Sequence, residues 1–251
     1  MNATQCSERY RETVVSAQTA VAIDARTRSL TVSTYCLYNL PMTQIEANQE
    51  RQPRVIALAG AISLAVAMGI GRFAFTPLLP MMLHDGLINI EAASWLASAN
   101  YLGYLLGALL CSFQPALWRR WSLPPLSVST MVKVGLSLTC VLTAAMALNL
   151  SASWALLRLL TGLTTAVTFV YTTTWCLGRL AQLNRPTAGG LVYVGPGIGI
   201  AGSGLLASLM VQLGWHSASG WLAFATLAAL ATLLVWSIYG DDHELQSVAG
   251  A

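Results

Sequence analysis

The sequence predicts an all-α, polytopic membrane protein with six transmembrane helices between residues 54 and 240. Its composition is the first reason, because 55% of the 251 residues are hydrophobic and only 9% are charged, against about a quarter charged in soluble domains. The placement of the acids is the second. Between Arg54 and Gly240 the only carboxylates are Asp85 and Glu91. A stretch with so few acidic side chains is suited to lipid rather than to water.

Six apolar runs are the third reason, since each is close to the ~20 residues that an α-helix needs to cross ~30 Å of hydrocarbon. We place them at about 55–82, 92–114, 126–149, 153–178, 187–212 and 218–239. Turn and charge signals separate consecutive runs. The polar segment 1–53 is expected to be a disordered cytoplasmic leader, and 241–251 an acidic cytoplasmic tail. Met42 precedes the first run closely and is an alternative translation start to Met1.

The arginines predict the orientation in the membrane. Alternate connections carry two each, namely Arg51 and Arg54, Arg119 and Arg120, and Arg179 and Arg185. The intervening loops 83–91, 150–152 and 213–217 contain neither Lys nor Arg. Because basic loops stay on the cytoplasmic side, we expect a multi-pass protein of the bacterial inner membrane with both termini in the cytoplasm.

Charged residues inside the runs are the first candidates for a functional site, because a central Arg costs roughly 2.5–3.5 kcal/mol on insertion scales. Lys133 is expected to extend to the membrane interface. Arg72 and Arg158 have no carboxylate within the spans to neutralise them. Two interpretations remain open for this pair. The guanidinium groups either hydrogen-bond to main-chain oxygens of other helices or bind an anionic substrate.

Polar residues of the second and fourth runs extend this candidate site. Threonines repeat at three-and-four spacing in the fourth run, so that they share one helix face with Arg158. They either satisfy their hydroxyl groups within their own helix or line a water-filled path. The candidate substrate-binding residues are Arg72, Arg158, Asn100, Tyr104, Thr161 and Thr165.

Glycine and proline mark places of close packing and bending. Gly103 and Gly107 form a GxxxG pattern in the second run, which favours close helix packing. In the fifth run Pro196 lacks a backbone donor, which predicts a kink lining a cavity. We therefore treat Gly195, Pro196 and Gly199 as candidates for a conformational element.

Several other classes of function are disfavoured by the same residues. A net charge of +3 without basic runs does not indicate nucleic-acid binding. The five cysteines show neither CxxC nor metal-ligand spacing, so no metal and no cofactor is predicted. An intramembrane serine protease is disfavoured, because Ser203 has no histidine within the spans to act as a base. We therefore predict that the chain is not an enzyme.

Three segments resemble the YbfB/YjiJ group of the major facilitator superfamily (MFS). They are Gly69-Ile-Gly-Arg-Phe-Ala-Phe-Thr-Pro-Leu-Leu-Pro-Met-Met82, Ala99-Asn-Tyr-Leu-Gly-Tyr-Leu-Leu-Gly-Ala108 and Leu157-Arg-Leu-Leu-Thr-Gly162. The resemblance implies one half bundle made of two inverted three-helix repeats. It also implies that the first and fourth helices, which carry Arg72 and Arg158, line a central cavity. Two features depart from the pattern: MFS members usually have twelve helices, and the loop before the third run keeps only Arg119 and Arg120.

The leading functional hypothesis is a secondary transporter that moves a small solute by alternating access and is present here as a six-helix half. The alternative is a truncated, non-transporting remnant of a twelve-helix transporter. The expected partners are the lipid bilayer, a small solute that the two arginines suggest to be anionic, and either a second copy or a second six-helix half.

Overall fold

The computed structural model describes residues 42–120, 127–148 and 151–239. The predicted acidic tail and residues 1–41 of the predicted leader lie outside these ranges, as does Met1. Residues from Gln52 onward form one compact unit, and side-chain packing is described within this unit. All regular elements in the described ranges are helices. The predicted all-α class is therefore confirmed.

The first membrane span is interrupted by a π-helix. It consists of α3 (Met42–Leu64), the π-helical segment η1 (Ala65–Phe73) and α4 (Phe75–His84). Pro77 has no N–H to donate to the carbonyl of Phe73, so regular α-helical bonding fails at this junction. The π-helical segment η1, whose turns are wider than those of an α-helix, ends at Phe73, directly before this missing hydrogen bond. Kinks in helices commonly occur at prolines and at π-helical turns.

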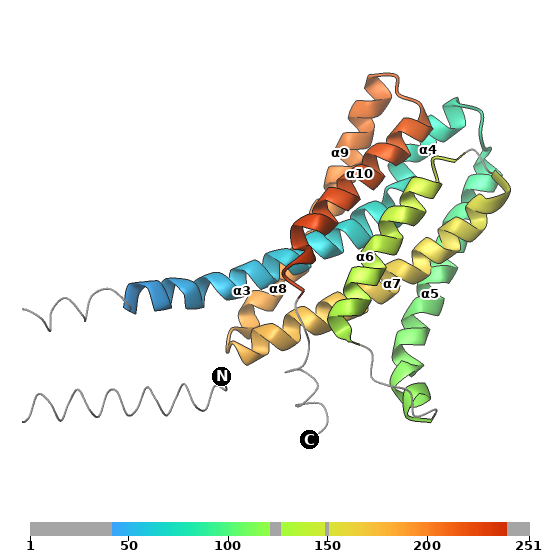
Figure 1. Ribbon diagram of the computed structural model, residues 1–251. Coiled ribbons are helices and arrows are strands. Elements are labelled where there is room, and N and C mark those ends of the chain that lie inside the picture. Colours follow the sequence, from blue (N-terminus) through green and yellow to red (C-terminus); the bar gives the residue numbers. More distant parts are fainter. Residues whose placement is uncertain (1–41, 121–126, 149–150, 240–251) are drawn as a thin grey trace, which may run out of the picture. The chain divides into compact units, whose positions relative to one another are not determined.

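The remaining spans follow in the predicted order (Figure 1). Six helical stretches are long and apolar enough to cross a membrane, which confirms the predicted number. Their elements after the first span are α5 (Ile90–Arg120), α6 (Val128–Ala145), α7 (Ser151–Gln182), the short 3₁₀ segment η2 (Pro186–Ala188), α8 (Gly189–Val192), α9 (Val194–Gln212) and α10 (Ser217–Trp236). Helices α5 and α7 extend beyond the predicted 92–114 and 153–178 toward the arginine-rich connections.

The helices pack in two equivalent sets. Helix α5 packs along α7, and α9 packs along the first span, mainly on η1. The first pair joins the second span to the fourth, and the second pair joins the fifth span to the first. The two pairs therefore occupy equivalent positions when spans one to three are matched with spans four to six. Helix α6 packs against α7 as α10 packs against the first span, and α6 contacts α10. This pairing is the arrangement expected of two inverted three-helix repeats.

Glycine residues allow the close approach within both pairs. A methyl group added at Gly103 would collide with the carbonyl oxygen of Leu159 on α7, and one at Gly195 with that of Ala61 on α3. Four residues further along, Gly107 faces Leu163 and Gly199 faces Ala65. The two glycine pairs have the same spacing and meet main-chain carbonyls in the same way. We call the first contact the α5–α7 seam and the second the α9 seam.

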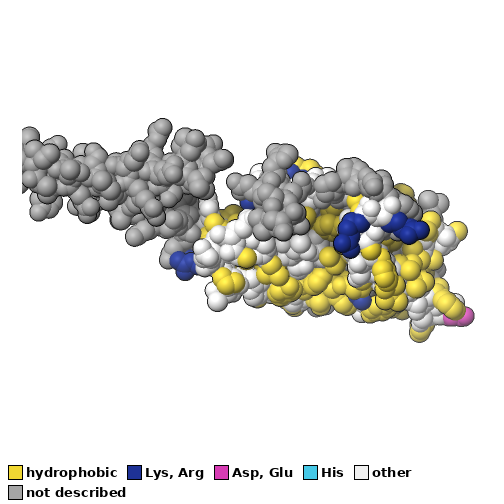
Figure 2. Space-filling model, turned by 90° about the horizontal axis from the view of Figure 1, so that it is seen from below, with side chains coloured by type: hydrophobic (Ala, Val, Ile, Leu, Met, Phe, Trp, Pro, Cys, Tyr) yellow, Lys and Arg dark blue, Asp and Glu magenta, His cyan; other side chains and the backbone are white. Residues whose placement is uncertain are grey.

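Large apolar side chains cover much of the outer surface of the spans. Figure 2 shows hydrophobic side chains along one face of the molecule, broken by a few separate Lys and Arg side chains. Exposed examples are Leu105 and Phe113 on α5, Ile198 and Leu205 on α9, and Leu233 on α10. In water such a surface would drive aggregation, whereas hydrocarbon is its natural solvent. The chain is a multi-pass membrane protein.

Candidate functional site

Arg158 lies inside the bundle and bonds to the main chain of the first span. Arg158 is 2% exposed, and its Nη1 donates to the carbonyl oxygen of Gly71 at 3.3 Å. Its Nη2 donates to the carbonyl oxygen of Arg72 at 3.1 Å, and the guanidinium lies 4.8 Å from the ring centre of Phe75. Arg158 thus ties α7 to the π-helical segment. This geometry is the helix-to-helix interpretation left open by the sequence.

The two carbonyls that accept from Arg158 belong to the π-helical segment or its end. In η1 the backbone bonds are displaced from the α-helical pattern, and Pro77 supplies no N–H to the following turn. A carbonyl left short of a donor inside a membrane must find one. The guanidinium, with five N–H donors and no acceptor, suits this role. Its Nε remains buried without a hydrogen-bond partner.

Arg72 occupies a different environment. Its side chain is only partly buried, and its Cζ atom lies 3.9 Å from the ring centre of Tyr104 and 5.0 Å from that of Tyr101. The ring centre of Phe73 is 5.5 Å away. Such cation–π contacts stabilise a guanidinium without satisfying its donors. The Nε of Arg72 is buried and has no hydrogen-bond partner.

The two cations share one region of the bundle, and no acid among the described residues balances them. Arg158 reaches the main chain of Arg72 directly, through its Nη2. Asp85, at the end of the first span, is paired with His84 and His216 and not with either arginine. A net positive region within membrane-spanning helices is costly. It is therefore a place where an anion would be stabilised.

Asn100 and Tyr104 lie on the same side of α5 as this pair. The Asn100 side chain is buried, and its Nδ2 donates to the carbonyl oxygen of Arg158 at 2.9 Å. Asn100 therefore fixes α5 to α7, whereas Tyr104 directly contacts Arg72 through its ring. Tyr101 is 56% exposed, and its ring lies beside the same guanidinium.

Thr161 and Thr165 are buried against the first span. The Thr161 hydroxyl donates to Leu157 O at 2.7 Å and the Thr165 hydroxyl to Gly162 O at 2.9 Å. A methyl group added at Gly71 would lie 2.6 Å from Cγ2 of Thr165, so the threonine methyl groups pack on that glycine. For these two residues the geometry favours the packing interpretation over the water-filled path.

The α-helix of the fifth span is interrupted just before Pro196. Regular helix stops at Val192 and resumes at Val194, because Pro196 cannot donate to the carbonyl of Val192. The flanking Gly195 and Gly199 face the first span. They form part of the α9 seam, which begins next to this interruption, and the kink lining a cavity stays a prediction.

A polar cluster where the first span ends and the sixth begins was not singled out from the sequence. Asp85, which follows α4, accepts a hydrogen bond from the N–H of Ser217 at 2.7 Å and lies 3.2 Å from Nδ1 of His216. Ser217 is the first residue of α10, whose preceding residue provides no side-chain cap. Asp85 thus caps α10 from a distant part of the chain. The scarcity of carboxylates between residues 54 and 240 was the available signal.

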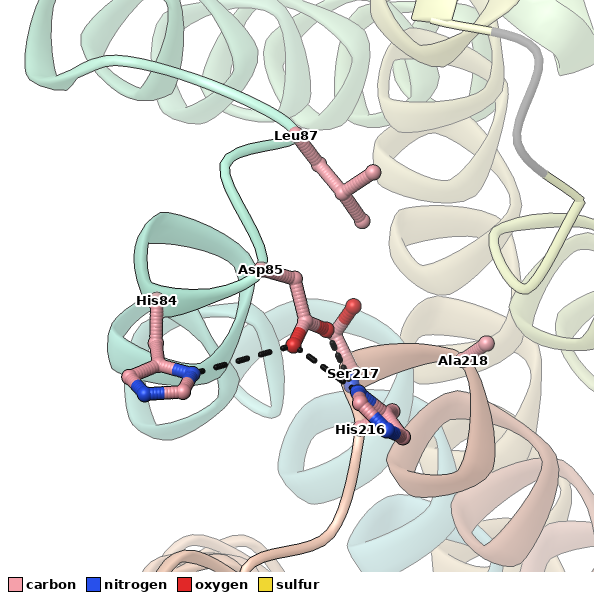
Figure 3. A pocket seen from close by; sticks show the side chains of 6 residues that line it. All are labelled: His84, Asp85, Leu87, His216, Ser217 and Ala218. Atoms are coloured by element: carbon pink, nitrogen blue, oxygen red, sulfur yellow. Dashed lines mark hydrogen bonds and ion pairs between the residues drawn. The ribbon is translucent and has the colours of Figure 1, made fainter.

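The environment of Asp85 favours its charged form. Hydrogen bonds from the Ser217 side chain and its N–H, together with His216, hold the pKa of Asp85 below its ordinary value, although burial acts in the opposite direction. His84, Asp85 and His216 are among the residues that line a cavity of ≈ 480 Å³. Figure 3 shows the two histidines on either side of the Asp85 carboxylate. The cluster joins the loop after the first span to the start of the sixth.

Lys133 lies against an aromatic residue of the sixth span, and its extension to the membrane interface stays a prediction. Its Nζ lies 5.5 Å from the ring of Trp236 at the end of α10.

Within the described residues, no group of three or more His, Cys, Asp or Glu side chains is arranged to hold a metal ion. The candidate site therefore consists of the arginine pair and the aromatic residues around it.

Comparison with known proteins identifies a family. Residues 64–248 match the family described as "uncharacterised MFS-type transporter YbfB", which confirms the resemblance to the YbfB/YjiJ group. No curated protein and no solved structure matches the chain.

Proposed function

The chain belongs to the YbfB family of MFS-type transporters, and on this premise we propose that it is one six-helix half of a secondary transporter for a small anionic solute. Alternating access moves the solute, with the two arginine-bearing spans lining the path. The proposal assigns substrate contact to Arg72 and Tyr104. Arg158, Asn100, Thr161 and Thr165 hold the helices that carry them.

The observation that carries the proposal is the state of Arg72. The residue is partly exposed, and its guanidinium lies on the ring of Tyr104. The Nε of Arg72 is buried without a hydrogen-bond partner, as is the Nε of Arg158, and Arg72 faces no carboxylate among the described residues. The two arginines differ at their terminal nitrogens, because both of those of Arg158 donate to main-chain carbonyls, whereas no described residue accepts a hydrogen bond from the side chain of Arg72. Free donors beside an uncompensated charge favour an anionic ligand.

We further propose that a second six-helix unit covers this side of the bundle. Tyr101 is exposed beside Arg72. Leu105 is exposed further along α5, and Ile198 and Leu205 are exposed on α9. A charged group open to hydrocarbon is expensive, whereas a facing unit would enclose it. The unit is either a second copy of this chain or a separate half. Its location would be the inner membrane, with the arginine-rich ends of the spans in the cytoplasm.

Transport by proteoliposomes tests the function. The purified full chain is reconstituted, and uptake of labelled benzoate, inorganic phosphate and glucose is compared with uptake by an Arg72→Gln variant. We expect Arg72-dependent uptake of an anion and none of glucose. Uptake that is equal in the variant, or restricted to glucose, would contradict the proposal.

The mass of the protein–detergent complex by light scattering tests the assembly. After subtraction of detergent, a mass of two chains supports a transporter completed by a second copy. A monomer that is inactive in proteoliposomes favours the alternative that this chain is a remnant without transport activity of its own.

A further inference from the structure

The orientation of the Arg72 guanidinium restricts what it can bind. A Cζ-to-ring-centre distance of 3.9 Å on Tyr104 is that of a guanidinium lying flat on the ring, because an edge-on approach would bring its nitrogens too close. The planar face is therefore occupied. The N–H donors lie in the plane of the group and point past the edge of the ring. What remains available is a flat fork of donors.

Arg158 cannot supply a second fork. Both of its terminal nitrogens donate to main-chain carbonyls of η1, and the residue is almost fully buried. These bonds use two of its five N–H groups, and burial keeps the remaining donors from a ligand. Arg158 therefore contributes positive potential but no accessible pair of donors. Asn100, the neighbouring amide, likewise donates to the main chain at Arg158. One fork is therefore offered to a ligand.

One flat fork matches one carboxylate. Arginine and carboxylate groups pair through two parallel N–H···O bonds in a common plane. A tetrahedral phosphate has further oxygens that need donors from other directions, and the groups beside Arg72 are the rings of Tyr101, Tyr104 and Phe73. Aromatic rings suit an apolar body next to the carboxylate.

We propose that the Arg72 fork binds the single carboxylate of an organic acid, whose apolar body contacts the rings of Phe73 and Tyr101. This inference rests on the proposed function for the location of the site and narrows its substrate class to monocarboxylates. Arg158 acts as a positioning residue, since it fixes the turn of η1 from which Arg72 projects.

Binding to the full chain in lipid nanodiscs tests the proposal without requiring transport. Dissociation constants are measured by calorimetry for benzoate, benzamide, acetate, terephthalate and inorganic phosphate. Benzamide has the shape of benzoate without its charge, acetate lacks the apolar body, and terephthalate adds a second carboxylate. We expect benzoate to bind at least about tenfold more tightly than benzamide, acetate or phosphate, and terephthalate to bind no more tightly than benzoate.

Variants locate the binding. Arg72→Gln removes the fork and is expected to weaken benzoate binding by at least about tenfold, and Arg72→Lys, which keeps the charge but not the planar fork, by several-fold. Lys133→Gln is the matched control, because it removes one positive charge from the spans at a position against Trp236. Its benzoate affinity should equal that of the unmodified chain. Each variant is first shown to be folded by its thermal unfolding midpoint.

The outcomes separate this inference from the proposed function. Phosphate binding as tight as benzoate binding, equal losses in Arg72→Gln and Lys133→Gln, or no benzoate binding by the folded chain would overturn the inference. If phosphate uptake depends on Arg72, the transporter proposal stands and the monocarboxylate assignment fails. If benzoate binds through Arg72 but no solute is transported, the assignment stands and the transporter proposal fails.

Discussion

The two seams of the bundle are packed through the same glycine pattern but differ in their polar side chains. In both, a GxxxG pattern brings one helix onto the main-chain carbonyls of another, with Gly103 and Gly107 in the α5–α7 seam and Gly195 and Gly199 in the α9 seam. The α5–α7 seam adds the hydrogen bond from Asn100 to the main chain of Arg158. In the α9 seam Gly69 and Gly199 meet backbone to backbone.

This difference separates the packing that both repeats share from the polar and aromatic groups that gather near one seam. Glycine spacing sets how closely helices approach in a membrane, where no hydrophobic force draws them together. Both repeats need this property. The arginines, the π-helical segment and the aromatic rings gather around the first, second and fourth spans, so the chemistry of the candidate site belongs to one side of a packing scheme that is otherwise duplicated.

The largest expected effect comes from breaking either seam. Gly103→Ala and Gly195→Ala each place a methyl group against a main-chain carbonyl, which only a movement of the helix can relieve. We expect each to lower the free energy of unfolding by about 3 kcal/mol, the upper part of the usual range for overpacking. Unfolding in mixed detergent measures the loss.

Gly197→Ala is the control for both seam variants, because a methyl group at Gly197 would meet no atom within 4 Å. Its unfolding free energy should change by less than about 0.5 kcal/mol. A large loss in one seam variant and none in the other would contradict the equivalence of the two seams.

Arg158→Gln sharpens the comparison by removing the polar tie between α7 and the first span. It leaves the carbonyl oxygens of Gly71 and Arg72 without their charged donor. We expect a loss of about 2 kcal/mol, measured in the same unfolding assay. Arg72→Gln should be close to neutral there, since Arg72 donates no hydrogen bond that holds two spans together. Equal losses would show that both arginines are structural.

Asn100→Leu probes the polar part of the α5–α7 seam alone. The substitution keeps the approximate volume but removes the donor to the carbonyl oxygen of Arg158, for which we expect a cost of about 1 kcal/mol. Thermal unfolding midpoints report the difference. An increase in stability would mean that packing, and not this hydrogen bond, dominates at Asn100.

The smallest effect is expected at Asp85, outside both seams. Its pKa is lowered in the folded protein, so its contribution to stability is complete above the unfolded pKa of about 3.9 and is lost as the pH falls through the lower folded value. Between pH 7 and 5 the contribution should not change. Asp85→Asn should cost less than about 1 kcal/mol at pH 7 and weaken the decline below pH 4. An unfolding midpoint that falls between pH 7 and 5 in the unmodified chain but not in the variant would contradict this.

Much of the fold could be predicted from the sequence because the thickness of hydrocarbon limits the length of an apolar run. The same limit does not apply where a helix continues into water, and α5 extends through Pro115 to Arg120 for that reason. The interruption of the helix before Pro196 follows from one missing N–H. The contact of the π-helical segment with Arg158 does not, because it joins carbonyl oxygens of the first span to a side chain of the fourth.

The arginine pair could be identified from the sequence, but its division of roles could not. The hydropathy pattern identifies both Arg72 and Arg158 as charged residues inside apolar runs and does not distinguish between them. Which of them faces main-chain oxygens is decided by the relative rotation of two helices, and that rotation is set by contacts such as Gly71 against Thr165. Asp85 was overlooked for a similar reason, since its partner Ser217, the first residue of α10, lies far along the chain.

The thiol of Cys176 offers a practical consequence of this packing. Cys176 is fully buried on α7, and a methyl group at Gly60 would lie 2.6 Å from its Sγ atom. A maleimide dye can reach the thiol only when α3 and α7 separate. In a chain whose other cysteines are replaced by serine, the rate of labelling at Cys176 would measure how often the bundle opens. This measurement can be made in an intact lipid bilayer, whereas unfolding in mixed detergent cannot.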